Sequence, residues 1–224
     1  MLRSCVIMAV SLGLGLLGIG TSAGQDCNLA DSFNGGFQQV WLLSDSEVVS
    51  VVNDVLRIQF DDWNSERSEE AMLDACLYSD LAIHVDVRDL NGTRGKEIGI
   101  RINGSNHYGY GINLRSDPLN DILIAKGGIA NRAIVAAATY PHETGTWHHL
   151  DIMASGPTII VDVDGLNVLQ FTDPDPILNG WVELRANPGA TYSAAAEFDN
   201  FSIEGYAAVD VTPATWGSVK ALYR

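Results

Sequence analysis

Residues 81–88 read LAIHVDVR, and this stretch decides the fold that the sequence predicts. Its odd-numbered residues are apolar, and its even-numbered residues are small, polar or charged. Successive side chains of a β-strand point to opposite faces, so the alternation predicts a strand with one face in the core and the other in water. Residues 96–103, KEIGIRIN, repeat the pattern, with isoleucines at positions 98, 100 and 102 predicted to share the core face.

The rest of the chain contains similar short strands, separated by turn residues. Asp164-Gly165 lies between two apolar runs and is a strong hairpin signal. Residues 61–70 are polar and predict a surface loop, with a short helix as an option at 68–73. Because no helical period intervenes, the pattern predicts an all-β, antiparallel two-sheet sandwich. Further strands are predicted at 48–52, 55–60, 107–114, 121–126, 133–139, 147–154, 158–162, 167–171, 181–185 and 194–204.

Residues 1–23 have the three parts of a secretory signal peptide. Arg3 is the only charge before Asp26, residues 5–19 are apolar, and residues 21–23 are small. A membrane anchor is the alternative, but the apolar run is short and rich in glycine for a span of roughly 20 residues. We expect cleavage after Ala23 and a secreted, periplasmic or cell-surface protein.

The remaining chain has room for one sandwich domain, which we place at residues 24–205. Residues 206–224 then form a linker and a short C-terminal segment. This segment is either an attachment tag or a last piece of chain that packs Trp216 and Tyr223 on the sandwich.

The chain is acidic, and this limits its partners. It has 13 Lys and Arg against 28 Asp and Glu, a net charge of −15, which becomes −16 when Arg3 leaves with the signal peptide. Nucleic acids and anionic membranes are bound by clustered basic residues, so we expect neither as a partner. After signal cleavage we also expect no membrane span. The acidic balance suits solubility, calcium binding or a saline environment alike.

Cys27 and Cys76 are the cysteines that remain after signal cleavage. An even pair in an oxidising compartment predicts a disulfide, and closing a loop of this length would stabilise the fold by about 4 kcal/mol. Two free buried thiols are the alternative.

Five segments together resemble one superfamily. Their order along residues 31–204 is similar to that in concanavalin A-like lectin/glucanase domains, and within these to laminin-G-like and 3-keto-disaccharide hydrolase-type modules. The resemblance implies a jelly-roll sandwich, and it implies a carbohydrate ligand without deciding between lectin, glycosidase and adhesion module. The segments are DSF at 31–33, WHHLDI at 147–152, IIVDVDG at 159–165, GWVEL at 180–184 and FDNFSI at 198–203.

The classical glucanase motif is incomplete in this chain. Glycosidases similar to this superfamily place their carboxylates in a Glu-x-Asp-x-x-Glu strand, where alternate residues share one face. Glu197 and Asp199 match its start, but Ser202 stands where the second Glu is needed. We therefore reject a classical glucanase site.

The polar face of the predicted central strands is the candidate ligand site. Histidines, carboxylates and arginines there could bind sugar hydroxyls or act as acid and base, although an ordinary solvated face is the simpler interpretation. Gly99, Gly109 and Gly111 are expected to leave room for a ligand. The candidate catalytic residues are His84, Asp86, Glu97 and His107, and the candidate ligand-binding residues are Arg101, Asn103, Asn113, Arg115 and the loop residue Trp63.

A structural calcium site is a further candidate. Asp31 and Asp199 are expected on neighbouring terminal strands, and hard oxygen ligands suit calcium. Tyr108 and Tyr110 share the apolar phase of their strand and are predicted in the core.

Three hypotheses for the function follow from the sequence. The first is an extracytoplasmic carbohydrate-binding module, the second a glycoside hydrolase of the 3-keto-disaccharide hydrolase type, and the third a non-catalytic surface or adhesion component. The sequence leaves open which of them applies.

Overall fold

The computed structural model describes residues 27–38, 40–44, 47–61, 69–90, 96–116, 119–187 and 193–207. Within these residues the chain forms fourteen strands and one short 3-10 helix, η1. The elements are β1 (Leu29–Asp31), β2 (Trp41–Leu43), β3 (Val49–Val52), β4 (Val55–Asp61), β5 (Glu69–Asp89), β6 (Lys96–Asn103), β7 (Tyr108–Arg115), β8 (Asp121–Gly127), η1 (Ile129–Asn131), β9 (Ala133–Thr139), β10 (His148–Ser155), β11 (Thr158–Val163), β12 (Leu166–Thr172), β13 (Gly180–Ala186) and β14 (Ser193–Ala207). No helix among the described residues is long and apolar enough to cross a membrane.

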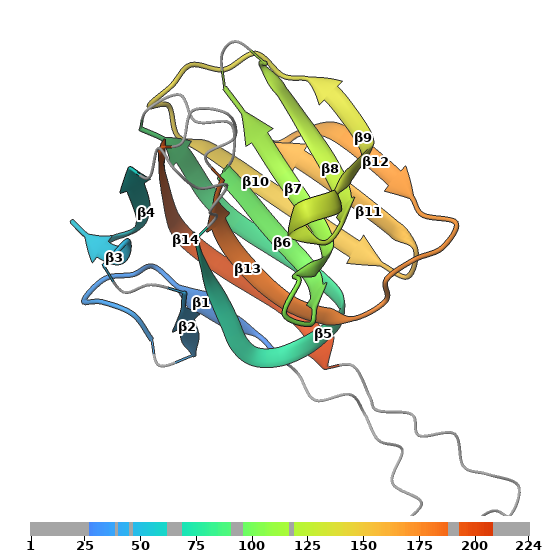
Figure 1. Ribbon diagram of the computed structural model, residues 1–224, viewed down its shortest axis with the longest axis horizontal. Coiled ribbons are helices and arrows are strands. Elements are labelled where there is room, and N and C mark those ends of the chain that lie inside the picture. The colour runs from blue at the N-terminus through green and yellow to red at the C-terminus, as the bar shows by residue number, and fades with distance from the viewer. Residues whose placement is uncertain are drawn as a thin grey trace, which may run out of the picture.

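The strands form two antiparallel layers, as the sequence predicts (Figure 1). Sheet A has the order β2-β5-β13-β6-β7-β8-β9, and sheet B has the order β4-β14-β5-β10-β11-β12, with β3 on the edge of β4 and β1 beside the end of β14. The long strand β5 belongs to both layers. Its first half pairs with β13, and its second half pairs with β10 and β14.

The core lies between the two layers. The apolar residues of the second half of β5, including Ile83 and Val85, are fully buried there. Sheet A contributes Ile98, Ile112 and Leu184 from the opposite side. Inside and outside positions therefore alternate along the strands as predicted from residues 81–88.

The alternation breaks in β6, and this corrects the prediction for its second half. Arg101 has a backbone φ of +53°, and the pairing of β6 shifts register between Ile100 and Asn103. Such a β-bulge reverses the side on which later residues lie. The side chain of Ile102 therefore lies over Gly99 and Gly109, on the outer face of sheet A, and not in the core.

Two smaller predictions are also corrected. Residues 69–73 belong to β5 and form no helix. Tyr110 is buried as expected, but Tyr108 is exposed at the start of β7.

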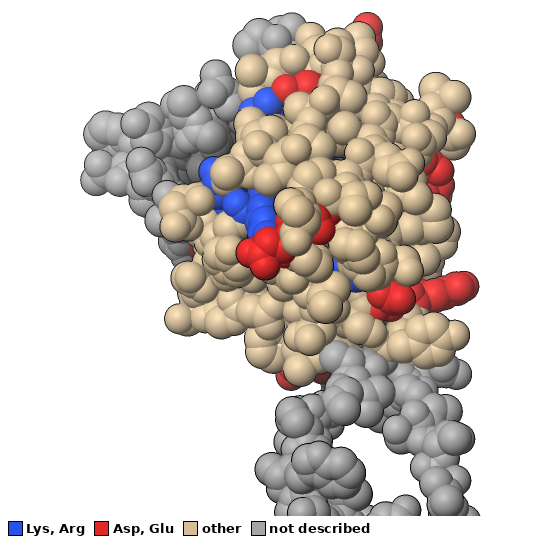
Figure 2. All heavy atoms as spheres, turned by 90° about the vertical axis from the view of Figure 1, so that its right-hand side faces the viewer, with Lys and Arg blue, Asp and Glu red and all other residues tan. Residues whose placement is uncertain are grey.

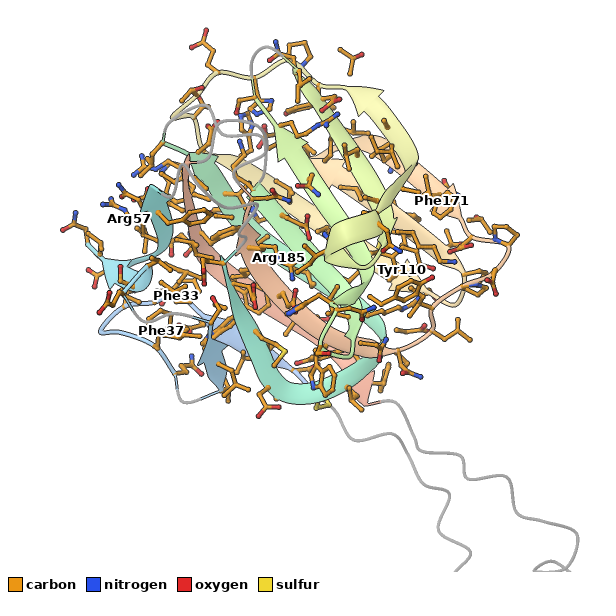
Figure 3. All side chains as sticks on the ribbon, viewed as in Figure 1. Phe33, Phe37, Arg57, Tyr110, Phe171 and Arg185 are labelled. Carbon is orange, nitrogen blue, oxygen red and sulfur yellow. A yellow bond between two sulfur atoms is a disulfide. The ribbon has the colours of Figure 1, made fainter. Side chains whose placement is uncertain are left out.

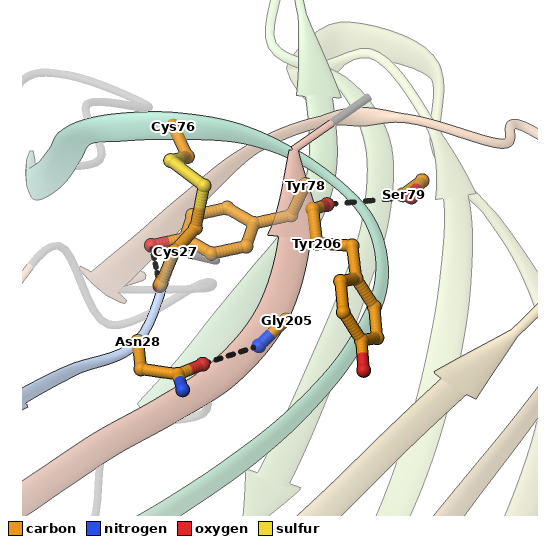
Figure 4. The surroundings of a disulfide bond; sticks show 7 residues. All are labelled: Cys27, Asn28, Cys76, Tyr78, Ser79, Gly205 and Tyr206. Carbon is orange, nitrogen blue, oxygen red and sulfur yellow. Dashed lines mark hydrogen bonds between the residues drawn. A yellow bond between two sulfur atoms is a disulfide. The ribbon is translucent and has the colours of Figure 1, made fainter. Parts of the chain in front are cut away.

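A disulfide joins Cys27 and Cys76, the two cysteines that the sequence pairs (Figure 4). The Cys27 amide donates a hydrogen bond to the Gly205 carbonyl at 3.0 Å, and the Tyr78 hydroxyl donates to the Cys27 carbonyl at 3.2 Å. The disulfide therefore ties the start of the described chain to β5, and the hydrogen bond to Gly205 ties it to β14. These contacts bring both ends of the sandwich to the bend of β5.

Candidate functional site

Seven polar side chains gather on the outer face of sheet A, which is turned away from the core. Arg185 lies near the middle of this face (Figure 3). Glu183 and Arg185 alternate on β13 with Val182 and Leu184, which point into the core. We call this group the sheet A cluster, and its members are Glu70, Glu97, His107, Asn113, Arg132, Glu183 and Arg185.

His107 is held over sheet A by the turn between β6 and β7. Its φ of +50° turns the chain back, so that the imidazole reaches β13 and β5. The Nδ1 of His107 lies 2.5 Å from Oε1 of Glu183, which is fully buried. The Nε2 lies 3.7 Å from Oε1 of Glu70. Glu183 therefore orients the ring, and the second nitrogen faces a second carboxylate.

Arg185 links the two halves of the sheet A cluster. It donates through Nη2 to Glu183 and through Nη1 to Oε1 of Glu97 at 3.2 Å. Its Nε is buried and has no hydrogen-bond partner among the described residues, although Oε2 of Glu70 lies 3.8 Å away. The guanidinium thus lies within 4 Å of three carboxylates, and its single positive charge is shared among them.

Glu97 is a buried carboxylate of the cluster that is held from several sides. It accepts from Nδ2 of Asn113 at 2.8 Å and from Nη1 of Arg132, which reaches over from the end of η1. A Cβ at Gly111 would lie 2.5 Å from Nη1 of Arg132. The space over Gly111 is therefore filled by this ion pair, which corrects the expectation that the glycines leave room for a ligand.

Burial and charge shift the titration of the cluster in different directions. Burial raises the pKa of Glu97, but the guanidiniums of Arg185 and Arg132 outweigh this and hold that pKa below its ordinary value. Burial raises the pKa of Glu70, and the nearby Arg185 only partly opposes it. The hydrogen bond to Glu183 raises the pKa of His107. Glu70 and His107, 14% and 22% exposed, are thus a partly accessible acid/base pair.

His84 and Asp86 do not join this cluster, which corrects the expectation of one shared polar face. They belong to the second half of β5, and Val85 between them faces the core from sheet B. Their side chains consequently lie on the outer face of sheet B, on the other side of the sandwich from Glu97. The cause is the passage of β5 from one sheet to the other, which strand alternation alone does not reveal.

Other predicted ligand-binding residues hold the fold together. Arg101 is fully buried, and its guanidinium donates to the carbonyls of Ser79, Gly156 and Ile177. Asn103 donates to the Asn179 carbonyl at 2.8 Å.

Arg115 is also separate from the sheet A cluster. It pairs with Asp121 across the β7–β8 hairpin, with its Nε 2.7 Å from the Asp121 carboxylate. Trp63 lies outside the described residues.

Asp31 and Asp199 are not brought together around one ion. The buried carboxylate of Asp31 accepts from the Phe33 amide and from Nε1 of Trp41, each at 2.8 Å. Asp199 lies opposite Asp86 on the outer side of β14. The predicted calcium ligands therefore point to different sides of sheet B.

Four members of the cluster were missed in the sequence: Glu70, Arg132, Glu183 and Arg185. The alternation in residues 180–186 does signal that Glu183 and Arg185 share a polar face. What the sequence lacks is the strand order that places β13 between β5 and β6.

The surface near β9 and β12 shows a different character from the sheet A cluster (Figure 2). Most of this face is uncharged, and acidic side chains lie beside its basic ones. Lys126 of β8 and Asp173, the residue after β12, form an ion pair with a distance of 2.8 Å. The described residues of this face form no extended basic patch.

Comparison with solved structures identifies the fold as a concanavalin A-like jelly roll. The carbohydrate-binding module CBM66 from Bacillus subtilis is 18% identical, with a TM-score of 0.62, and the match covers 74% of this chain and 96% of the module. A prokaryotic β-1,3-1,4-glucanase (lichenase) from a mouse hindgut metagenome is 12% identical, with a TM-score of 0.64 and coverages of 80% and 99%. The GH43 protein BlXynB from Bacillus licheniformis is 16% identical, with a TM-score of 0.58 and coverages of 79% and 39%.

No curated protein matches the chain. The family described as 3-keto-alpha-glucoside-1,2-lyase-like domain matches residues 29–204, which run from β1 into β14. Because this match spans nearly the whole sandwich, the chain belongs to the family of 3-keto-alpha-glucoside-1,2-lyase-like domains.

Proposed function

We propose that this chain cleaves 3-keto glycosides by elimination, and that the sheet A cluster is its active site. The observation that carries the proposal is the pair formed by Glu70 and His107. Their reactive atoms lie 3.7 Å apart, both side chains are partly exposed, and a buried carboxylate orients the histidine. The family description supports the choice of substrate.

The reaction needs one base and one acid. A ketone at C3 of the sugar makes the proton on C2 acidic. The base removes this proton, the C–H electrons pass into the enolate, and the C1–O bond then breaks to leave a C1=C2 double bond beside the ketone. The departing oxygen takes a proton from the acid. Positive charge near the carbonyl oxygen stabilises the enolate.

The cluster can supply each of these roles. Glu70 is the base, because a raised pKa makes a carboxylate a better proton acceptor. His107 is the acid, because its bond to Glu183 favours the imidazolium. Arg185 and Arg132 supply positive charge from beneath the substrate. With three carboxylates and three cations the cluster is close to neutral, and when Glu70 takes the C2 proton its negative charge passes to the enolate, which faces the remaining excess of positive charge.

The titration of this pair predicts a bell-shaped dependence of kcat/KM on pH. Activity falls at low pH when Glu70 takes a proton and at high pH when His107 loses one. Since both pKa values are raised, both limbs lie at higher pH than the ordinary values of 4.5 and 6.5 for these groups.

A substrate deuterated at C2 tests the reaction. Turnover of 3-keto disaccharides should release the label to water, whereas hydrolysis would retain it, and native disaccharides should not react. Glu70→Gln and His107→Gln should each lower kcat by roughly 10²–10⁴-fold. Glu204→Gln, an exposed glutamate on β14, is the matched control and should retain full activity. Unchanged turnover in both site variants would refute the assignment.

A non-catalytic carbohydrate-binding module is the second candidate. It is favoured by the ion pairs that already fill the face over Gly111 and by the likeness to CBM66, whose length the match almost completely covers. Binding of a glycan by the wild-type chain without turnover of any 3-keto substrate would select this function.

A further inference from the structure

A second polar group lies on the outer face of sheet B, away from the sheet A cluster. β5 contributes His84, and the adjacent β10 contributes His149 and Asp151. One ligand atom from each of these residues lies within 4.8 Å of the other two. Since Asp151 is paired with His84 across the two strands, the geometry is set by regular sheet pairing and not by a loop. We call these three residues the sheet B triad.

One pair of atoms in the triad already has the spacing of two ligands on one ion. Nε2 of His149 is 3.3 Å from Oδ1 of Asp151, and Nδ1 of His84 contacts the same oxygen. Two ligands bound to a tetrahedral zinc ion at about 2.0–2.1 Å are about 3.3 Å apart. To hold an ion between these atoms, His84 exchanges its contact with Asp151 for the ion, and its Nδ1 moves to about 3.3 Å from the Asp151 oxygen.

Neighbouring residues hold His149 in the tautomer that binds a metal. Oδ1 of Asp86 lies 2.6 Å from Nδ1 of His149, which leaves Nε2 to face the triad. Nδ2 of Asn200 donates to the other oxygen of Asp86 at 2.7 Å. Asn200 reaches this position because β14 carries a bulge there, with a φ of +48°. A carboxylate behind a ligating histidine is the usual support of protein zinc sites.

The site is open and its surroundings are negative. The side chains of His84, His149 and Asp151 are 43%, 45% and 28% exposed, so an ion can enter from solvent and a water molecule can complete four ligands. Asp162 and Asp199 lie on the flanking strands, opposite Asp151 and Asp86 respectively. Their charge attracts a cation to this part of the sheet.

We propose that the sheet B triad binds one divalent transition-metal ion of the zinc class. Two imidazole nitrogens and one carboxylate suit zinc, whereas calcium requires six to eight oxygen ligands. The alternative is a set of surface hydrogen bonds without a metal. Such a set does not need the imidazole of His149 to be oriented by a second carboxylate, yet Asp86 orients it and Asn200 holds Asp86. The site is independent of the elimination reaction.

Calorimetric titration of the full chain, purified without a histidine tag and stripped with a chelator, tests the proposal. Zinc chloride should bind with one ion per chain and a Kd of micromolar order, and calcium chloride should not bind there. Cobalt(II) should give the visible absorption of a four-coordinate site. A zinc Kd weaker than about 1 mM would overturn the proposal.

Matched variants locate the ion. His149→Gln and Asp151→Asn should each weaken zinc binding at least 100-fold, and Asp86→Asn should weaken it about 10–100-fold. Asp175→Asn removes an exposed carboxylate from the loop after β12, where the backbone contacts Lys126 of sheet A, and should leave the Kd within about threefold of the wild type. Circular dichroism of each metal-free variant checks the fold. Binding that survives in His149→Gln and Asp151→Asn but is lost in His107→Gln would place the ion on sheet A and refute the assignment.

Discussion

The buried lysine at the start of β6 makes a pH-dependent contribution to stability that can be measured. Lys96 is fully buried, and its Nζ lies 3.5 Å from Oδ1 of Asp89 and 3.1 Å from Oγ of Ser116. Burial lowers the pKa of Lys96 to about 8, although Asp89 acts in the opposite direction. An unfolded chain titrates this lysine at its ordinary value of 10.5.

The sign of the effect follows from proton counts. Between pH 8 and 10.5 the unfolded chain binds more protons at Lys96 than the folded chain, so the free energy of unfolding rises with pH in this window. A difference of 2.5 pH units corresponds to about 3 kcal/mol in total. About 2 kcal/mol of this is gained between pH 7 and pH 9.5.

Urea denaturation at pH 7.0 and pH 9.5 measures this contribution. From pH 7.0 to pH 9.5 the free energy of unfolding should rise by about 2 kcal/mol more in the wild type than in Lys96→Met. Lys126→Met is the matched control, because Asp173 raises the pKa of Lys126, whose titration then falls above this window. An identical pH dependence in the wild type and Lys96→Met would refute the reasoning.

Three further predictions concern stability. Replacing both Cys27 and Cys76 with alanine should lower the free energy of unfolding by about 4 kcal/mol, as measured by urea denaturation, since the bond closes a separation of 49 residues; no change would contradict this. Gly111→Ala should cost about 1–3 kcal/mol by the same assay, because its Cβ would overlap the guanidinium of Arg132, and wild-type stability would show that the ion pair can move aside. Glu197→Gln should lower stability by about 3 kcal/mol, because two arginines pair with this fully buried carboxylate; an unchanged melting temperature would disprove that role.

Local pattern predicted much of the fold. The alternation in residues 81–88 correctly separated core from surface positions, because the period of a strand depends only on neighbouring residues. Asp164-Gly165 correctly marked the β11–β12 hairpin, where both residues have the positive φ that such turns need. The bulge at Arg101 had no such local signal, and the predicted faces failed beyond it.

The candidate site was only partly predictable, because it depends on pairing between distant segments. Glu97 and Asn113 lie on consecutive strands and come together as parity indicated, and His107 joins them from the turn between these strands. Glu183 lies 76 residues after His107 in the sequence, and its place beside β6 depends on the order of all the strands in the sheet. Long-range order of this kind leaves no trace in local periodicity.

Because β5 belongs to both sheets, His84 and Asp86 do not share a polar face with Glu97 as predicted, and the two proposed sites are separate. Glu70 and His84 lie on the same strand, yet they face outward from different sheets because the strand bends between its two halves. The apolar interior, including Ile83 and Leu184, lies between the two outer faces. The sheet A cluster and the sheet B triad share no hydrogen-bond partner among the described residues. A change of charge in one of them is therefore weakened by distance before it reaches the other. One jelly roll can thus carry acid/base chemistry on sheet A and bind a metal ion on sheet B without either site constraining the residues of the other.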